Sequence, residues 1–421
     1  MLREYLEIVR SFNRDVRLYL LSGALVGFAS SSGIYNLLLN IYLLRLGYDI
    51  GFVGFVNATG AAAYALLCLP AGAMGRRWGP RRMIVLGLAL IAVGNSMLPF
   101  AEFMPREWQA HWLIFARLPR AFGFALSIVN AGPFLLSITT RVERTHVFSV
   151  QAAMWPIAGF AGNLVGGVLP GTIAALTGTS LDAPAPYRYP LFFAAAMIVP
   201  AALAVAATRQ TEGLPAGGGA QGVSPRPRGP MAAVAVAGFL CAISMATQQT
   251  FFNVYMDDFL GEPTALIGAV SATAMLVSGL AALSTPLIVA SRGQRSTIAA
   301  TSLLAGAALL PVMLSGNWAG AACTVFLVHA LSAIRLPVLT VFQQEIVEAR
   351  WRPGMAAVSS MAMGFSFMLT GGFGGQVIAA SGYGTLFAIA AVASVLGTAL
   401  FSAYFRPARI EELKGAAAQP A

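Results

Sequence analysis

About twelve apolar stretches, each close to 20 residues long, fill this chain between Leu18 and Phe405. A bilayer core about 30 Å thick requires ~20 apolar residues in a helix that rises 1.5 Å per residue. The pattern therefore predicts an all-α protein that crosses a membrane many times. The expected spans are 18–44, 52–75, 83–102, 110–138, 147–175, 189–208, 231–256, 264–290, 296–315, 319–344, 355–379 and 385–405.

Most of the 26 basic residues lie in the two terminal segments and in every second loop, such as Arg76 to Arg82 and Arg292 to Arg295. The opposite loops contain only Arg45, Arg106 and Arg188. Loops rich in Lys and Arg stay on the cytoplasmic side of a membrane. We therefore expect a multi-pass protein of the cell's inner (plasma) membrane with both termini in the cytoplasm.

Composition excludes several classes of protein. Only 10% of the residues are charged, compared with about 25% in soluble domains. The net charge of +10 is spread over loops that flank the spans, so the expected partner is the lipid bilayer and not a nucleic acid. Cys68, Cys241 and Cys323 lie inside apolar spans without the spacing of metal ligands, which predicts neither a metal nor a cofactor. No paired carboxylates or nucleophile–base set appears, so we do not expect an enzyme.

A Gly/Pro-rich run at 209–230 divides the spans into two groups of six. The predicted domains are a first bundle at 1–208 with a short amphipathic cytoplasmic start, a cytoplasmic linker at 209–230, a second bundle at 231–405 and a cytoplasmic tail at 406–421. The two bundles share short matches in the same order. These pair Asn40-Ile-Tyr42 with Asn253-Val-Tyr255, Gly79 and Arg81 with Gly293 and Arg295, and Arg117-Leu-Pro119 with Arg335-Leu-Pro337. We therefore predict twelve transmembrane helices in two pseudo-symmetric six-helix bundles, which is a transporter architecture.

Three segments resemble signatures of the major facilitator superfamily. The segment GAMGRRWGPRR at Gly72–Arg82 resembles the first cytoplasmic signature, although Arg76 stands where the family has Asp. ARLPRAFGFA in the fourth span resembles the Arg-x-x-x-Gly signature, and GNLVGG in the fifth resembles the antiporter signature with Asn163 in the Pro position. The resemblance implies a monomeric secondary transporter in which two bundles rock around a central cavity.

Arginines inside the spans indicate the charge of the substrate. Arg117 and Arg120 share one face of the fourth span, Arg335 lies in the tenth, and no acid occupies the middle of any span. Because arginine stays charged, these residues favour an organic anion held by Arg120 and Arg335, with Arg117 as a third contact. The alternative is that the arginines snorkel or bind carbonyls freed at Pro119 and Pro337.

Amides and one histidine are further candidates. Asn36 and Asn40 are four residues apart on the first span, and Gln249 and Asn253 are so spaced on the seventh. We expect Asn36 and Gln249 to contact substrate and Asn40 and Asn253 to close an outer gate; helix–helix hydrogen bonding alone is the alternative. His329 is either a packing residue or a titrating substrate contact. Predicted gating residues on the cytoplasmic side are Arg76, Arg77, Arg81, Glu345 and Arg350, with Glu345 in a cluster with Glu348, Arg350 and Arg352 or acting in proton coupling.

The predicted function is secondary active or facilitative transport of a small organic solute, an organic anion. Coupling to a proton or a counter-substrate is left open. One alternative is a multidrug or amphiphile exporter acting as a proton antiporter, which the fifth-span resemblance favours. A second is a non-transporting membrane sensor or a lipid scramblase.

The topology is tested by protease accessibility. We expect protease to cut the 209–230 linker in inverted vesicles and to spare it in right-side-out vesicles, because the linker is predicted to be cytoplasmic. The fragments are identified by mass, with an epitope on the tail as a second marker of sidedness. Cleavage from the outside would contradict the predicted orientation.

Overall fold

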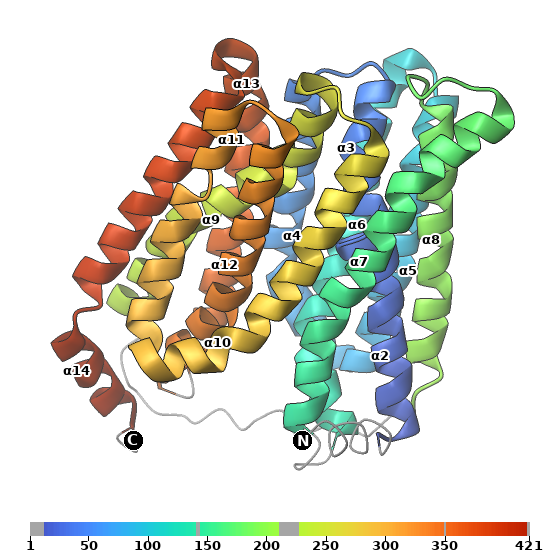
Figure 1. Cartoon of the computed structure of the whole chain (residues 1–421). Helices are drawn as coiled ribbons and strands as arrows, with labels where there is room; N and C mark the ends of the chain where they lie inside the picture. The colour runs from blue at the N-terminus through green and yellow to red at the C-terminus, as the bar shows by residue number, and fades with distance from the viewer. Residues whose placement is uncertain (1–11, 140–143, 210–226, 349–350, 419–421) are drawn as a thin grey trace. The chain divides into compact units, whose positions relative to one another are not determined.

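The computed structural model describes residues 12–139, 144–209, 227–348 and 351–418, and all regular elements in these ranges are helical (Figure 1). The predicted amphipathic start falls outside the described residues, as does nearly all of the predicted linker.

Seven of the expected spans each correspond to a single helix. These are α4 (Ile50–Trp78), α5 (Pro80–Met97), α6 (Arg106–Ile138), α7 (Arg144–Thr177), α8 (Ala185–Ala206), α9 (Arg228–Val254) and α12 (Trp318–Glu345). A short 3-10 turn, η2 (Pro99–Phe103), extends α5, and the π-helical turn η3 (Tyr255–Phe259) extends α9.

Two longer helices each cover two spans. α10 (Thr264–Ala307) bends at Gly293, where φ is 75°, and α13 (Arg352–Tyr404) bends at Gly382, where φ is 80°. Glycine tolerates this left-handed backbone, so the chain reverses without a loop. α11 (Leu310–Ser315) continues the ninth span, and α14 (Pro407–Ala418) follows the last one. The described residues contain 10 helices long and apolar enough to span a membrane, and these two bends bring the crossings to the predicted twelve.

The first expected span is helical, as predicted, but its helix is interrupted. α2 (Arg14–Val26) is followed by a π-helical turn, η1 (Gly27–Ser31). Two residues, Ser32 and Gly33, separate this turn from α3 (Ile34–Arg45). We did not predict this break, because the expected span 18–44 is apolar and contains no proline that would mark the end of a helix. π-helical turns inside helices are frequent at functional sites.

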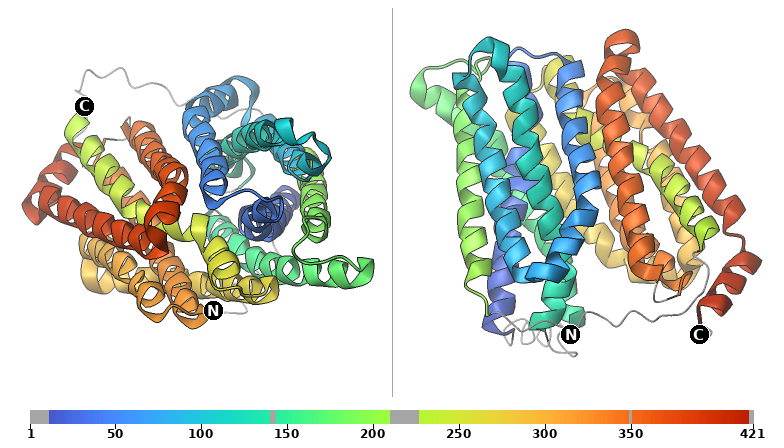
Figure 2. Two further views of the ribbon diagram at one scale, coloured as in Figure 1. Left: turned by 90° about the horizontal axis from the view of Figure 1, so that it is seen from above. Right: turned by 180° about the vertical axis from the view of Figure 1, so that it is seen from behind.

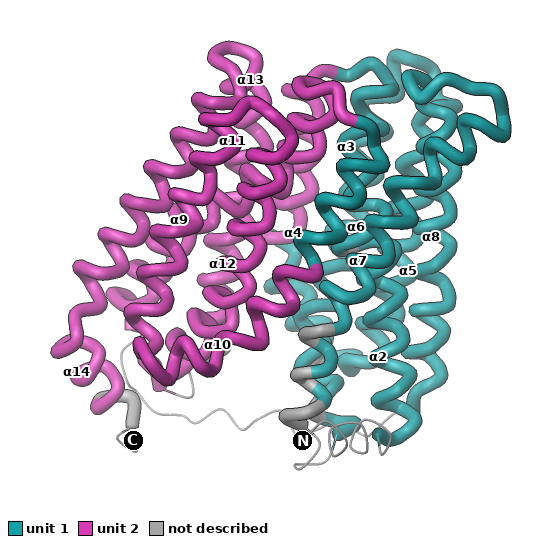
Figure 3. The backbone as a smooth tube through the Cα atoms, in the orientation of Figure 1, with its two compact units in different colours: residues 1–48, 66–217, 263–275 teal, residues 49–65, 218–262, 276–421 magenta. Residues whose placement is uncertain are grey.

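The chain forms two compact units, shown in Figure 3, that do not follow the two groups of six spans. Unit 1 contains residues 1–48, 66–217 and 263–275, and unit 2 contains residues 49–65, 218–262 and 276–421. The beginning of α4 therefore belongs with unit 2, and the beginning of α10 belongs with unit 1.

Close contacts at glycines explain why the start of α4 packs within unit 2 and the start of α10 packs within unit 1. In unit 2, a Cβ added to Gly54 of α4 would lie 2.2 Å from the carbonyl oxygen of Gly371 in α13. In unit 1, a Cβ on Gly268 of α10 would lie 2.7 Å from the Cα of Gly167 in α7. Such close backbone approach is a feature of transmembrane helix packing between small residues.

The sequence repeat between Arg81 and Arg295 is also a structural repeat. Within unit 1, the guanidinium of Arg81 donates from Nε to the carbonyl of Val205 at 3.4 Å and from Nη2 to the carbonyl of Ala206, at the end of α8. Within unit 2, Arg295 donates to the carbonyls of Phe405 at 2.5 Å and Ser402 at 3.0 Å, at the end of α13. Each arginine thus satisfies C-terminal carbonyls that have no partner within their own helix.

Removing either cap should destabilise its unit. We expect Arg81→Ala and Arg295→Ala each to lower the free energy of unfolding by roughly 1–2 kcal/mol, through the loss of charged hydrogen bonds at the ends of α8 and α13. Thermal unfolding of the purified protein in detergent measures the effect. The exposed neighbours provide matched controls, Arg82→Ala and Arg292→Ala, and equal losses in the controls would show that capping is not the cause.

Candidate functional site

The interruption of the first span forms one side of a polar site in unit 1. A Cβ added to Gly33 would lie 1.8 Å from the carbonyl oxygen of Phe28, so only glycine fits this bend. The Ser32 carbonyl accepts a hydrogen bond from Nδ2 of Asn163 at 2.7 Å. Asn163, on α7, is 2% exposed. Asn163 is therefore the buried side chain that supports the interruption from a neighbouring helix.

The glycines of α7 surround this contact. A Cβ on Gly159 would lie 2.6 Å from Cβ of Ser32, and one on Gly162 would lie 2.1 Å from the carbonyl oxygen of Phe28. One on Gly166 would lie 3.2 Å from the Cα of Ile34, at the start of α3. The glycine run of the fifth span therefore serves close helix packing, and it packs against the interrupted segment.

Arg117 and Arg120 both contact Tyr35, which is 1% exposed and lies in the first turn of α3. Nη1 of Arg117 donates to the Tyr35 hydroxyl at 3.3 Å. The guanidinium carbon of Arg120 lies 4.5 Å from the centroid of the Tyr35 ring, within the range of a cation–π interaction. One tyrosine therefore fixes both guanidiniums relative to α3.

Two further side chains complete the group. Nε of Arg120 donates to Oδ1 of Asn95 on α5 at 3.1 Å, and Nδ2 of Asn95 donates to Oγ of Ser30 in η1 at 3.3 Å. We call Ser30, Tyr35, Asn95, Arg117 and Arg120 the arginine cluster. It joins η1, α3, α5 and α6, all inside unit 1.

The arginine cluster carries an excess of positive charge. In the part of the chain that the structure describes, Arg120 contacts a neutral amide and an aromatic ring, and Arg117 is a second cation close by. A guanidinium has five N–H donors, and Arg120 uses one of them on these described residues. The arrangement can therefore accept a negatively charged group at Arg120, which is only partly buried.

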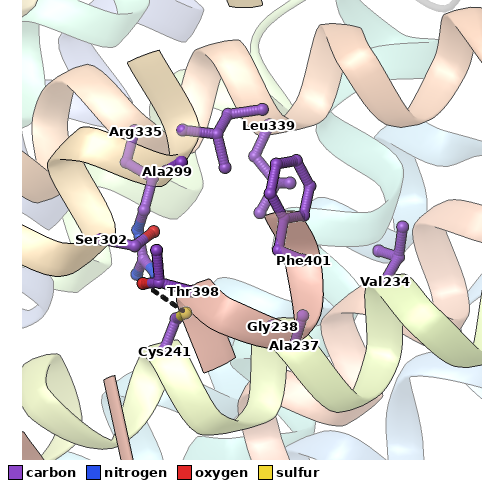
Figure 4. A pocket seen from close by; sticks show the side chains of 11 residues that line it. Val234, Ala237, Gly238, Cys241, Ala299, Ser302, Arg335, Leu339, Thr398 and Phe401 are labelled. Carbon is purple, nitrogen blue, oxygen red and sulfur yellow. Dashed lines mark hydrogen bonds between the residues drawn. The ribbon is translucent and has the colours of Figure 1, made fainter. Parts of the chain in front are cut away.

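Arg335 belongs to unit 2. It is 4% exposed, on α12, and it borders a small cavity between α9, α10, α12 and α13 (Figure 4). A shared role of Arg120 and Arg335 in one substrate site stays a prediction.

The predicted amides have different environments. Asn40 on α3 and Asn253 on α9 are buried, whereas Asn36 is exposed and Gln249 is half-buried. Nδ1 of His329 lies 3.0 Å from the carbonyl oxygen of Val325, so Nδ1 carries the proton and Nε2 is the acceptor. The gate and substrate roles of these side chains stay predictions.

Three predicted gating residues of the cytoplasmic side have described contacts inside single units: Glu345, Arg77 and Arg81. Glu345 pairs with Lys414 of α14 at 2.5 Å and accepts from Gln294 at 3.2 Å, so its described partners are not those of the predicted cluster. Arg77 lies over the Trp78 ring at 5.6 Å, and Arg81 caps α8. Arg350 lies outside the described residues, as do the side chains of Arg76 and Arg352.

Sequence reasoning missed Ser30, Tyr35, Asn95 and the capping role of Asn163. Asn95 offered a signal, because it is an amide in the middle of an otherwise apolar span. Tyr35 offered none, since a tyrosine in a membrane helix is usually read as packing or as an interface anchor.

Comparisons with known proteins agree on one family. A sequence model described as Major Facilitator Superfamily matches residues 20–233. An uncharacterized MFS-type transporter of Mycobacterium tuberculosis, Rv1250, is 31% identical over 130 residues, which is 30% of this chain and 20% of that protein. The match thus spans about a fifth of the length of that relative.

Solved structures show the same fold. A crystal structure of a mutant of the nucleoside transporter NupG has a TM-score of 0.71 at 16% identity, covering 94% of this chain and 100% of that chain. A bacterial homolog of the human lysosomal transporter Spinster, inward-facing and occupied, has a TM-score of 0.66 at 14% identity, covering 100% and 99%.

Asn163→Leu should destabilise the protein by about 1–3 kcal/mol, because it leaves the half-buried Ser32 carbonyl without its donor from α7. Thermal unfolding in detergent measures the loss. Thr172→Val is the control on the same helix, since Thr172 is exposed and bonds only within α7 among its described contacts. An unchanged melting temperature for Asn163→Leu would show that the interruption does not depend on this hydrogen bond.

Proposed function

Because the chain belongs to the major facilitator superfamily, we propose that it transports an organic anion across the membrane by alternating access, with the arginine cluster as the anion-binding part of unit 1. The family makes the protein a multi-pass membrane transporter of a small-molecule substrate. The charge of the substrate is our inference, and the observation that carries it is the environment of Arg120.

Two guanidiniums and one helix end concentrate positive charge at the same place. Tyr35, which contacts both arginines, belongs to the first turn of α3. The N-terminus of a helix carries about half a positive charge and presents unpaired N–H groups. Interrupted helices that direct this end toward an anionic substrate are a recurrent device in transporters.

Electrostatics favours an anionic substrate over a neutral one. Arginine cannot lose its proton at accessible pH, so burial of Arg120 without an anionic partner costs free energy. A carboxylate or a phosphate ester can accept two parallel hydrogen bonds from one guanidinium. The stacking of Arg120 on Tyr35 and its bond to Asn95 hold the guanidinium plane in place, which lowers the entropic cost of this recognition.

Coupling of transport to protons would require a titrating group inside the membrane. The sequence places no carboxylate in the middle of a span, so His329 and Glu345 are the candidates for proton coupling. Glu345 is paired with Lys414 on the surface of unit 2. We propose facilitated transport or exchange of anions, which requires no titrating carboxylate inside the membrane.

Uptake into proteoliposomes tests the substrate class. The panel contains mono- and dicarboxylates, aromatic carboxylates, phosphate esters, neutral nucleosides and cationic amphiphiles. We expect saturable uptake of at least one anion class. Arg120→Ala should reduce that uptake about 10- to 100-fold, which corresponds to the loss of hydrogen bonds to a charged group. Arg120→Lys should retain part of it, because the charge remains while the paired donors are lost.

The control is Arg292→Ala, which removes an exposed arginine from the bend of α10 and should leave uptake unchanged. Transport of a neutral nucleoside or a cationic amphiphile at equal rates by wild type and Arg120→Ala would contradict the proposal. That result would favour the amphiphile-exporter alternative.

A further inference from the structure

A second arginine in unit 2 borders a cavity of its own. Arg335 is 4% exposed, and its Nε has no hydrogen-bond partner among the described residues. The guanidinium lies beside Cys241 of α9, and Ser302 of α10 and Thr398 of α13 line the same cavity (Figure 4). Residues of α9, α10, α12 and α13 line the cavity, and all of these lining residues belong to unit 2.

The side chains around the cavity offer no negative charge. Apart from Arg335, the lining is apolar or carries a hydroxyl or a thiol: Val234, Ala237, Gly238, Cys241, Ile298, Ala299, Ser302, Leu339, Thr398 and Phe401. The Thr398 hydroxyl donates to the carbonyl of Ser394 at 2.7 Å, within its own helix. Ser302 is buried and lines the same cavity, so its hydroxyl can supply a second donor there.

The size of the cavity decides what can neutralise this charge. Its volume is about 20 Å³, and a single buried water needs ~10–15 Å³ by the same measure. This space holds one water or one monatomic ion, but not the whole of a multi-atom organic acid. A water molecule can accept a hydrogen bond from Arg335, but it leaves the permanent charge uncompensated in a medium of low dielectric constant.

We propose that the Arg335 cavity binds a monatomic anion, chloride, which compensates the buried guanidinium and stabilises unit 2. The anion accepts hydrogen bonds from Arg335 and from the Ser302 hydroxyl, and Ile298, Leu339 and Phe401 form the apolar part of the lining. This role goes beyond the transport function, because it assigns Arg335 an inorganic partner whichever solute is carried. It also separates Arg335 from Arg120, which sequence reasoning assigned to the same substrate.

Halide-dependent stability tests the proposal on the purified full chain in detergent. Melting temperature is measured while sodium gluconate is replaced by sodium chloride or sodium bromide at constant ionic strength. We expect a saturable rise with either halide in wild type and its loss in Arg335→Gln. Arg292→Gln is the matched control, because it removes the same charge from an exposed position and should keep the rise.

Ser302→Ala supports the test should Arg335→Gln fail to fold. It preserves the guanidinium and removes one donor, so the chloride concentration at half-saturation should increase roughly fivefold. Crystals grown in bromide should show anomalous density between Arg335 and Ser302.

Three outcomes would overturn the proposal: no saturable halide effect in wild type, an equal loss in Arg292→Gln, or density for bromide only at other positions. An equal rise with acetate would also overturn it, since it would show that the cavity admits carboxylates and that Arg335 recognises organic anions.

Discussion

Every polar group of the backbone must find a partner inside the protein wherever the chain lies in hydrocarbon, and this requirement governs the structure. Helices meet it along most of each span. At the break inside the first span a side chain meets it, because Asn163 donates to the Ser32 carbonyl. Arg81 and Arg295 satisfy carbonyls in the same way at the ends of α8 and α13. Polar and basic side chains that the sequence presents as isolated features are thus partners of specific carbonyls.

The same environment raises the free energy of a charge that has no counter-charge. The two units surround their buried or partly buried arginines in different ways. In unit 1, Arg120 is partly exposed and is held by Tyr35 and Asn95, an arrangement suited to a solute that arrives and leaves. In unit 2, Arg335 is buried beside a cavity of about 20 Å³, which suits a small resident ion. Arg120 and Arg335, which the sequence assigned to one substrate, therefore differ in access and in the space beside them.

Much of the fold was predictable because hydrophobic length and charge placement are local properties. The twelve crossings and the match between Arg81 and Arg295 follow from residue patterns, and the structure agrees. The break at Gly27–Ser31 was not predictable, because apolar content does not distinguish a continuous helix from one with a π-helical turn. Nor was the exchange of the starts of α4 and α10 between units, which depends on glycine contacts between distant segments.

The candidate site was likewise predictable only in part. The sequence by itself determined that permanent positive charges lie within the fourth and tenth spans without acids in mid-span, and that glycines fill the fifth. Only the tertiary structure decided that Tyr35 lies between Arg117 and Arg120, that Asn163 supports the break beside them, and that Arg335 has its own cavity. Composition and period fix which residues enter the membrane, whereas the partner of each polar group is fixed by helices that are distant in sequence and pack together only in the folded protein.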